Sequence, residues 1–412
     1  MSTQSSSKMG KAWVVFFIFF IAAVFIISGN NDKVAANMVL LMSDLGINAT
    51  VTGLMVTVAA VLGGIAAIPI GAAMVKTGPR LIGLIAILMA LAGCIIGALA
   101  PNSAILMIGR FFDGTAIGVI GVVVPSVVAA LFPEEKRSLP MGIWTCWVSI
   151  GYIVVLFGTN LLADEAAPHT WVNVWWALSA VFVIIFLLVA FLGKMPNGAN
   201  EVGDVSKEKV TIKDGFSSIP AILCGLIMLF LAVIVVIYSS FVPTYLNLSL
   251  GFDLAKANAL TSLNSFGMMI GGILMGIALL KIKNKNMALL IFAILTGILS
   301  VFVFLFPANL AAVYLFLLGL ISQCVMATLF TVAPEAAPSP ELVPITMSFL
   351  TFGQLMAGLT VTIAGAILDA KGFAALSYFV GVMGVLFIAV CATFVIYMKK
   401  RNDKKSIVEV KK

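Results

Sequence analysis

The stretch LIGLIAILMALAGCIIGALA, residues 81–100, decides the class of this protein. It has no charged side chain, and about 20 mostly apolar residues are what an α-helix needs to cross a bilayer. The whole 412-residue chain is similar, with 62% hydrophobic and 10% charged residues and a mean hydropathy of +1.18. Soluble domains are about 45–50% apolar and about 25% charged. The composition excludes a soluble, disordered, coiled-coil or nucleic-acid-binding protein and predicts an all-α polytopic membrane protein.

Twelve such segments follow one another, with Gly, Pro and Asn at the joints, as in Gly78-Pro79. The longest polar stretch, 194–218, divides them into two groups of six. The predicted domains are a bundle over 1–193, a cytoplasmic linker over 194–218, a second bundle over 219–398 and a basic cytoplasmic tail over 399–412. The predicted spans are 12–42, 52–74, 81–100, 104–131, 139–163, 172–193, 219–247, 256–280, 287–306, 309–332, 342–368 and 373–398.

The net charge of +7 is best explained by membrane orientation. With a cytoplasmic N-terminus, 20 of the 24 Lys and Arg residues fall in cytoplasmic segments, and the outer loops hold only Lys256 and Lys371. Basic residues concentrate on the cytoplasmic side of membrane proteins. We therefore expect a multi-pass protein of the cytoplasmic membrane with both termini in the cytoplasm. Its expected partners are the lipid bilayer, a small-molecule substrate and protons.

The five cysteines lie in apolar runs without metal-ligand spacing, and the one histidine, His169, lies in a short polar stretch. Small buried hydrophobic side chains are the expected role of the cysteines. No metal, no cofactor and no nucleic acid is expected, and we expect a monomer.

The two halves share an internal repeat. Five residues recur with the same identity 205 positions later, at equivalent ends of the predicted spans. The pattern favours two pseudo-symmetric six-helix bundles of parallel topology, with a binding site at their interface near the middle of the membrane. The pairs are Gly46 and Gly251, Gly71 and Gly276, Lys76 and Lys281, Gly114 and Gly319, and Asp164 and Asp369.

The loop between the second and third spans reads GAAMVKTGPR over residues 71–80. It resembles the GxxxD(R/K)xGR(R/K) signature of the major facilitator superfamily, with Val75 in place of the Asp. The resemblance implies a gating role for Gly71, Lys76, Gly78 and Arg80. In physical terms, the glycines permit a tight turn and a close approach of helices.

Two further stretches extend the resemblance over essentially the whole chain. Residues 110–114, RFFDG, are similar to the family's RxxQG signature on helix 4. Helix 5 reads MGIWTCWVSIG over 141–151 and lacks the Gly-Pro signature of drug/proton antiporters. Together with FPEEKR at 132–137, it looks most like the cyanate/nitroimidazole-type and related organic-anion subgroups. The resemblance implies a secondary transporter whose helices 1, 4, 7 and 10 line a cavity.

Four ionisable residues lie inside predicted spans, Asp32 and Lys33 on helix 1 and Arg110 and Asp113 on helix 4. Both pairs fall in the outer half of the membrane, at compatible depths. Ionisable groups in a bilayer are costly and are functional hypotheses by default. At 100° per residue, Lys33 shares a face of helix 1 with two amides, and Arg110 shares a face with Asp113. The two amides are Asn30 and Asn37.

Two interpretations of these charges stay open, besides that of helix-1 side chains reaching the outer headgroups. In one, they form a structural ion network between helices 1 and 4. In the other, Arg110 or Lys33 meets an anionic substrate, and Asp32 or Asp113 is the proton-coupling group. Because the family often pairs a helix-1 acid with the helix-4 Arg, we expect a contact between Asp32 and Arg110.

The remaining substrate-binding candidates are amides and aromatic side chains, for which interhelical hydrogen bonding or packing is the alternative role. Trp144, Trp147 and Gly151 form one predicted stripe on helix 5. The full set of substrate-binding candidates is Asn30, Lys33, Asn37, Arg110, Trp144, Trp147, Tyr152, Tyr238, Tyr245, Asn264, Gln323 and Gln354.

These features favour a secondary active transporter that moves a small organic anion by alternating access, as a proton symporter. A proton-coupled exporter of drugs or amphipathic compounds is the alternative, and a non-transporting scaffold or receptor is the alternative of another class. No phosphate-binding loop indicates ATP drive, and the chain lacks the nucleophile and base set of an enzyme.

Overall fold

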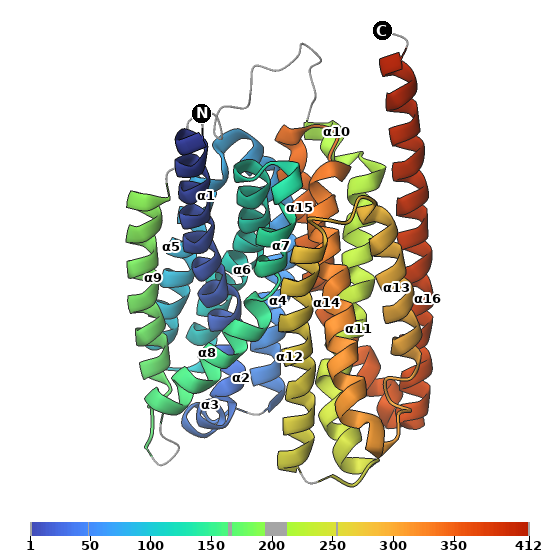
Figure 1. Cartoon of the computed structure of the whole chain (residues 1–412). Helices are drawn as coiled ribbons and strands as arrows, with labels where there is room; N and C mark the ends of the chain where they lie inside the picture. The colour runs from blue at the N-terminus through green and yellow to red at the C-terminus, as the bar shows by residue number, and fades with distance from the viewer. Residues whose placement is uncertain (1, 48, 164–166, 194–211, 253, 411–412) are drawn as a thin grey trace. The chain divides into compact units, whose positions relative to one another are not determined.

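The computed structural model describes residues 2–47, 49–163, 167–193, 212–252 and 254–410. Over these residues all regular secondary structure is helical (Figure 1). The prediction of an all-α protein is therefore confirmed. Of the predicted linker, residues 194–211 lie outside the described part of the chain.

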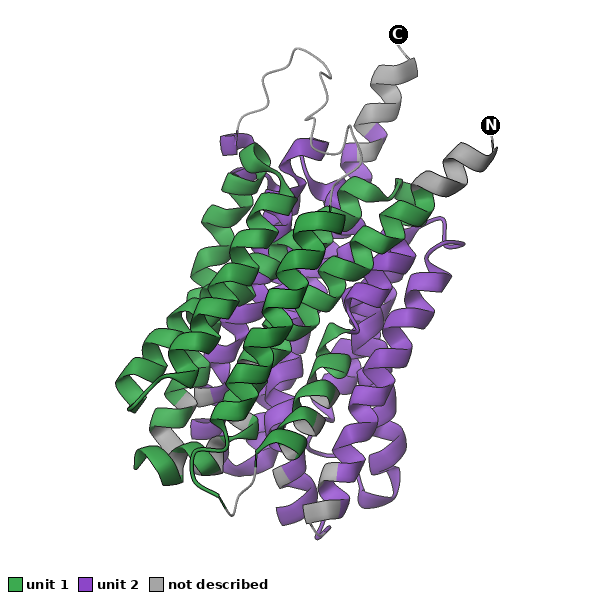
Figure 2. Ribbon diagram, turned by 90° about the vertical axis from the view of Figure 1, so that its left-hand side faces the viewer, with its two compact units in different colours: residues 1–137, 147–209 green, residues 138–146, 210–412 purple. Residues whose placement is uncertain are grey.

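The chain forms two compact units, residues 1–137 with 147–209 and residues 138–146 with 210–412 (Figure 2). The helices of the first unit are α1 (Ser2–Ala23), η1 (Val24–Gly29), α2 (Asn30–Ala36), α3 (Met38–Leu45), α4 (Ala49–Thr77), α5 (Pro79–Ala98), α6 (Ser103–Leu131), η2 (Glu134–Lys136), α8 (Trp147–Leu162) and α9 (Val172–Leu192). Those of the second unit are α7 (Ser138–Trp144), α10 (Ile212–Phe216), α11 (Ile219–Leu248), α12 (Leu254–Ala278), α13 (Lys285–Val301), η3 (Ala308–Leu310), α14 (Ala311–Ala336), η4 (Pro340–Leu342), α15 (Val343–Met356), η5 (Ala357–Leu359) and α16 (Thr360–Val410).

Ten helical segments in the described residues are long and apolar enough to cross a membrane. They correspond to ten of the predicted spans. The ninth predicted span is the shorter apolar helix α13, and the fifth is formed by α7 and α8 together. All twelve predicted spans are therefore helical, and the protein is a multi-pass membrane protein.

The first predicted span, 12–42, is helical, but it is not one continuous α-helix. After α1 the chain makes a π-helical turn, η1, resumes as α2 and breaks at Asn37, whose φ of −107° and ψ of 18° are not helical. A π-helical turn changes the rotation of every following residue about the axis. Lys33 therefore lies on a seven-residue helix between two irregular points.

The fifth predicted span is also interrupted, at Thr145 and Cys146. The Thr145 hydroxyl donates to the Gly142 carbonyl at 2.8 Å, and the Cys146 amide donates to the Ile143 carbonyl at 3.0 Å. These local bonds compete with the regular pattern of the α-helix. The break separates α7, which belongs to the second unit, from α8, which belongs to the first.

The last two predicted spans meet at Gly372, whose φ of 76° is left-handed and suits a residue without a Cβ. Beyond it, α16 continues to Val410, so the predicted tail begins as part of the last helix.

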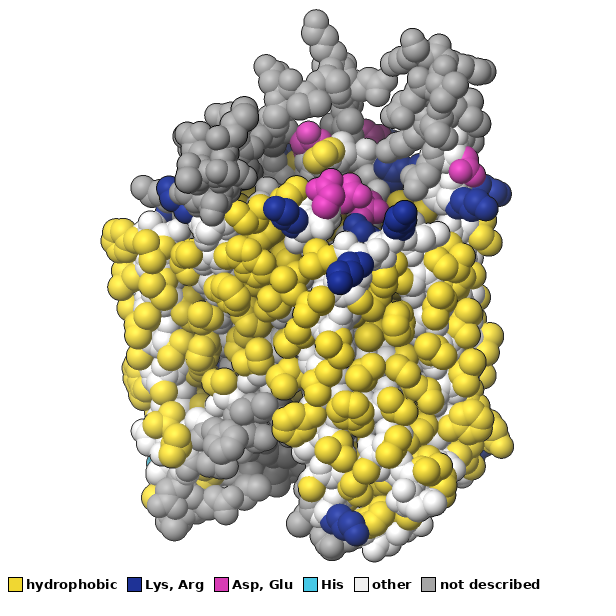
Figure 3. Space-filling view, viewed as in Figure 1, with side chains coloured by type: hydrophobic (Ala, Val, Ile, Leu, Met, Phe, Trp, Pro, Cys, Tyr) yellow, Lys and Arg dark blue, Asp and Glu magenta, His cyan; other side chains and the backbone are white. Residues whose placement is uncertain are grey.

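The exposed side chains of the spans are largely apolar. Figure 3 shows a face covered by hydrophobic side chains, with the acidic and most of the basic side chains gathered along one edge. Such a surface suits lipid rather than water. Among the described residues, the charged side chains with an exposed fraction of 1% or less are Lys33, Arg110 and Asp113.

The internal repeat is also present in three dimensions within each unit. A Cβ added to Gly114 of α6 would meet the backbone of Ala59 on α4, and one added to Gly319 of α14 would meet the backbone of Asn264 on α12. Gly319 lies 205 positions after Gly114, and Asn264 lies 205 positions after Ala59. The same close helix crossing therefore recurs, and both copies require glycine.

We expect Gly118→Val to destabilise the first unit strongly. A Cβ at Gly118 would overlap the backbone of Gly63 on α4, and overpacking costs about 1–3 kcal/mol or more. Gly158→Val on α8 is the matched control, because nothing lies within 4 Å of its added Cβ. Thermal unfolding of the detergent-solubilised protein should give a clearly lower melting temperature for Gly118→Val alone. Equal melting temperatures would contradict the close crossing.

Candidate functional site

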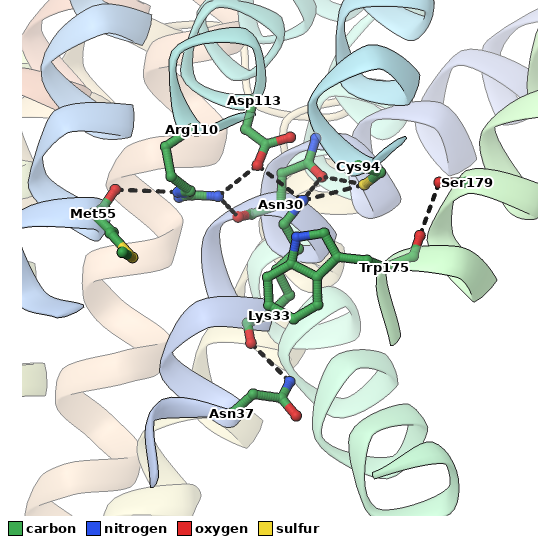
Figure 4. A network of polar contacts seen from close by, with 9 residues as sticks. All are labelled: Asn30, Lys33, Asn37, Met55, Cys94, Arg110, Asp113, Trp175 and Ser179. Carbon is green, nitrogen blue, oxygen red and sulfur yellow. Dashed lines mark hydrogen bonds and ion pairs between the residues drawn. The ribbon is translucent and has the colours of Figure 1, made fainter. Parts of the chain in front are cut away.

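The buried charges of the first unit gather in one polar network (Figure 4). We call it the buried charge cluster and define it as Asn30, Lys33, Cys94, Arg110, Asp113 and Trp175. Its members come from α2, α5, α6 and α9.

One carboxylate oxygen holds the cluster together. Asp113 Oδ2 lies 2.8 Å from Lys33 Nζ and 2.9 Å from Arg110 Nη1. Arg110 also donates to the backbone, through Nε to the Met55 carbonyl at 3.1 Å and through Nη1 to the Asn30 carbonyl. The guanidinium therefore connects α6 to α4 and α2, while Asp113 connects α6 to α2 a second time.

The Lys33 ammonium contacts three polar side chains and one aromatic ring. Besides Asp113, its ammonium donates to Asn30 Oδ1 at 2.9 Å and to Cys94 Sγ at 3.1 Å. The Trp175 ring lies 5.2 Å from Nζ, within the range of a cation–π interaction. The exposed fraction of Lys33 is 0%.

Glycines make room for these side chains. A Cβ added to Gly93 would meet the Asp113 carboxylate, and one added to Gly97 would meet the Trp175 indole. The two glycines are four residues apart and so lie on the same side of α5. At the end of α2, the Asn37 amide donates to the Lys33 carbonyl at 2.8 Å and so closes the helix that carries the lysine.

The cluster has a surplus of positive charge and of hydrogen-bond donors. Its three charged groups, two cations and one carboxylate, sum to +1. Arg110 Nη2, Asn30 Nδ2 and Trp175 Nε1 are buried donors without a hydrogen-bond partner, and Asp113 Oδ1 is an acceptor without one. Most buried polar groups in folded proteins are satisfied, so this concentration of unsatisfied donors is unusual. The arrangement is chemically suited to an anion.

Four of the residues singled out in the sequence are brought together here, namely Asn30, Lys33, Arg110 and Asp113. Arg110 bonds to Asp113, which lies one turn away on its own helix, and Lys33 contacts the same carboxylate of α6. Asp32 is half-buried. The expected contact between Asp32 and Arg110 stays a prediction.

The candidates of the second unit make neutral hydrogen bonds. Tyr238 on α11 shares a hydrogen bond of 3.4 Å with Ser322 on α14, and Tyr245 donates to the Phe306 carbonyl at 2.9 Å. Asn264 and Gln323 are buried and donate to backbone carbonyls at 3.0 and 2.7 Å, those of Leu315 and Thr145. Gln354 is half-buried on α15.

The predicted aromatic stripe on helix 5 is not continuous. Trp144, on α7, packs edge-on against Phe330 with ring centroids 6.2 Å apart. Trp147 begins α8, beyond the break, so the regular helical spacing on which the stripe depended is lost. The side chain of Tyr152, also on α8, lies outside the described part of the chain.

The predicted gating loop forms a tight turn between α4 and α5. Gly71 is buried in α4, Lys76 is exposed in its last turn, and Gly78 has a φ of 76° that a residue with a Cβ rarely adopts. Arg80 donates to the carbonyl of Ala190 near the end of α9 at 2.5 Å. Basic side chains at helix C-termini interact favourably with the helix dipole.

Two members of the cluster were not identified in the sequence. Cys94 is buried, as expected for a small hydrophobic residue, but its thiol also contacts Lys33. Trp175 has no sequence signal beyond its place in an apolar span, because its contact with Lys33 depends on the rotation of α9 about its axis.

The sequence profile of the Major Facilitator Superfamily matches residues 12–361. The chain belongs to this superfamily. Among curated relatives, it is 24% identical to the putative metabolite transport protein YwtG of Bacillus subtilis, over 49% of this chain and 43% of the relative. It is 25% identical to the TsgA homolog of Edwardsiella ictaluri, over 74% and 75%. It is 30% identical to the cyanate transport protein CynX of Escherichia coli, over 24% and 26%. The matches to the first two curated relatives span less than half of their length.

Solved structures of superfamily members share the fold. The outward-conformation structure of FucP has a TM-score of 0.74 at 16% identity, covering 94% of this chain and 98% of FucP. The proton:xylose symporter XylE gives 0.73 at 14%, covering 94% and 96%. The human organic anion transporter MFSD10 gives 0.68 at 14%, covering 93% and 98%. The predicted twelve-helix fold of this superfamily is therefore confirmed.

We expect Asp113→Asn to destabilise the protein more than Lys33→Met. The first substitution removes the counter-charge of buried Arg110, and breaking a buried pair costs about 3–5 kcal/mol. The second keeps the Arg110–Asp113 pair intact. Melting temperatures of the two purified variants, compared with that of the unsubstituted protein, test the order. An Asp113→Asn protein as stable as Lys33→Met would show that the shared carboxylate does not hold the cluster together.

Proposed function

We propose that this protein is a secondary active transporter that moves a small organic anion across the cytoplasmic membrane by alternating access, in symport with protons. The observation that carries the proposal is the surplus of positive charge in the buried charge cluster, with one guanidinium nitrogen of Arg110 left without a partner. Membership of a transporter superfamily supplies the class of function.

An anion would complete the cluster both electrically and geometrically. Burying an uncompensated charge is costly, and a bound monoanion would bring the sum of charges from +1 to zero. Arg110 supplies a planar guanidinium, which suits carboxylates. Asn30 and Trp175 add two N–H groups that have no partner in the protein.

Two further observations support proton coupling. The cluster contains groups that can exchange a proton, and the structural neighbour XylE is described as a proton:xylose symporter. The sequence assigned the proton to Asp32 or Asp113, and that assignment stays a prediction.

The neutral polar groups of the second unit keep a second candidate function open, proton-driven export of amphipathic compounds. Tyr238, Asn264 and Gln323 are buried without a charged neighbour among their hydrogen-bond partners. Uncharged polar groups of this kind would suit a ligand without a negative charge.

Proteoliposomes distinguish the two directions. We expect labelled monoanions from a panel of lactate, pyruvate, nicotinate and cyanate to accumulate only under an inward proton gradient, above the background of protein-free liposomes. Efflux of a cationic amphiphile coupled to proton entry, with no anion uptake, would instead favour the exporter.

We expect Arg110→Ala to abolish anion binding, measured as the loss of the thermal stabilisation that the panel confers on the purified protein. Arg401→Ala is the matched control, because Arg401 also donates to backbone carbonyls, those of Glu335, Ala336 and Ala337, but lies in the second unit. This control should lose stability and keep the ligand-induced shift. Unchanged ligand affinity in Arg110→Ala, with lower stability, would favour a purely structural network.

A further inference from the structure

We infer that Asp44, on α3, is a positioning residue for anion binding, because through Trp171 it holds Trp175 in place beside Lys33. The inference rests on the proposed function. It deepens that function by naming the contact that fixes one hydrogen-bond donor of the anion site, Trp175 Nε1.

One carboxylate oxygen of Asp44 connects α3 to the turn that leads into α9. Asp44 Oδ2 accepts from the indole Nε1 of Trp171 at 2.9 Å and from the backbone amide of His169 at 2.6 Å. The His169 imidazole is farther away, with Nδ1 at 3.5 Å, and its side chain is 68% exposed, whereas that of Asp44 is 8% exposed. Exposed ion pairs contribute little. The two N–H bonds therefore hold the segments together.

Trp171 passes this constraint to Trp175. The two residues are one helical turn apart, and their rings meet edge to face with centroids 5.0 Å apart and an interplanar angle of 79°. Edge-to-face contacts of this geometry are favourable. Tryptophans at the ends of membrane spans usually lie among lipid headgroups. Trp171 is only 1% exposed, so it is enclosed by protein, and its N–H bonds to Asp44.

Trp175 is in turn fixed between α5 and α2. Its ring lies 5.2 Å from Lys33 Nζ (Figure 4), and a Cβ added to Gly97 would overlap its indole nitrogen. That nitrogen is a buried donor without a hydrogen-bond partner and is one of the groups proposed to bind the anion. A rotation of the Trp175 side chain would therefore move this donor and take the ring away from Lys33 at the same time.

The two segments that Asp44 joins are the ones that meet at Lys33. Helix α3 follows α2, which carries Lys33, and only Asn37 lies between them. Because the backbone of Asn37 is not helical, α3 does not inherit its direction from a continuous helix, and contacts must set its place against α9. The bonds to Asp44 supply such contacts. A nearly buried carboxylate is costly unless it is paired or hydrogen-bonded, so its use here indicates a specific geometric role.

The position of Trp175 can be measured without knowing the substrate. In full-length protein labelled with 5-fluorotryptophan, the ¹⁹F resonance that disappears in Trp175→Phe identifies this residue among the six tryptophans. We expect Asp44→Ala to shift the Trp175 resonance in the anion-free protein, because the acceptor for Trp171 is lost. Asp44→Asn is the matched control. It removes the charge but keeps an oxygen that can accept, so the resonance should stay in place.

Anion affinity supplies the second readout, from the dependence of the melting temperature on the concentration of the panel anion that stabilises the unsubstituted protein most. Asp44→Ala and Trp171→Phe should each weaken binding about tenfold, the effect of roughly one hydrogen bond. Trp171→Phe keeps an aromatic ring and removes the N–H, so it tests the inference even if Asp44→Ala does not fold. Asp44→Asn should bind normally. So should Trp176→Phe, the control on the same helix, because Trp176 is 45% exposed.

An unmoved Trp175 resonance in Asp44→Ala would overturn the inference and leave anion transport itself untouched. Full affinity in Asp44→Ala and Trp171→Phe, with lower stability alone, would do the same, as would an equal loss of affinity in Asp44→Asn. A shifted Trp175 resonance in Asp44→Ala, in a protein that binds none of the panel, would instead contradict the proposed anion transport and uphold the contact from Asp44 to Trp175. The two failures are therefore distinguishable.

Discussion

The first unit depends on one carboxylate that two cations share. In an interior of low dielectric, Lys33 and Arg110 are tolerated only because Asp113 lies within 3 Å of both. The same contacts fix the rotation of α2 and α6 and bring the lysine against α5 and α9. A charge interaction of this kind constrains geometry more tightly than the packing of apolar side chains, because its partners must meet at hydrogen-bond distance.

Close helix approach makes this interaction possible. Gly93 and Gly97 leave the space on α5 into which the Asp113 carboxylate and the Trp175 indole project, and Gly114 lets α6 approach α4. The glycines therefore do more than permit packing in a lipid environment. They bring polar groups on different helices within reach of one another, in a protein where the surrounding lipid offers no alternative hydrogen-bond partner.

The class of protein, the twelve helical segments, the repeat and the four membrane-embedded charges could all be predicted from the sequence. These features depend on composition and on spacing along the chain. The contact of Lys33 with Asp113 could not be predicted, because assigning residues to faces at 100° each assumes an unbroken α-helix. The π-helical turn before Asn30 and the break at Thr145 both violate that assumption, and neither contains a proline that would reveal it. Contacts of Cys94 and Trp175 depend on helix rotation, which no local pattern specifies.

The repeat bears on whether the cluster is structural or functional. At the positions 205 residues after Arg110 and Asp113, the second unit has Leu315 and Leu318, both fully buried, and after Lys33 it has Tyr238. The glycine crossing between α12 and α14 nevertheless matches that between α4 and α6. The fold therefore accommodates apolar residues where the first unit has an ion network. Buried ion pairs are in general no more stabilising than well-packed hydrophobic residues of similar volume. Architecture alone therefore does not demand these charges, which agrees with the proposed role of the cluster in binding an anion.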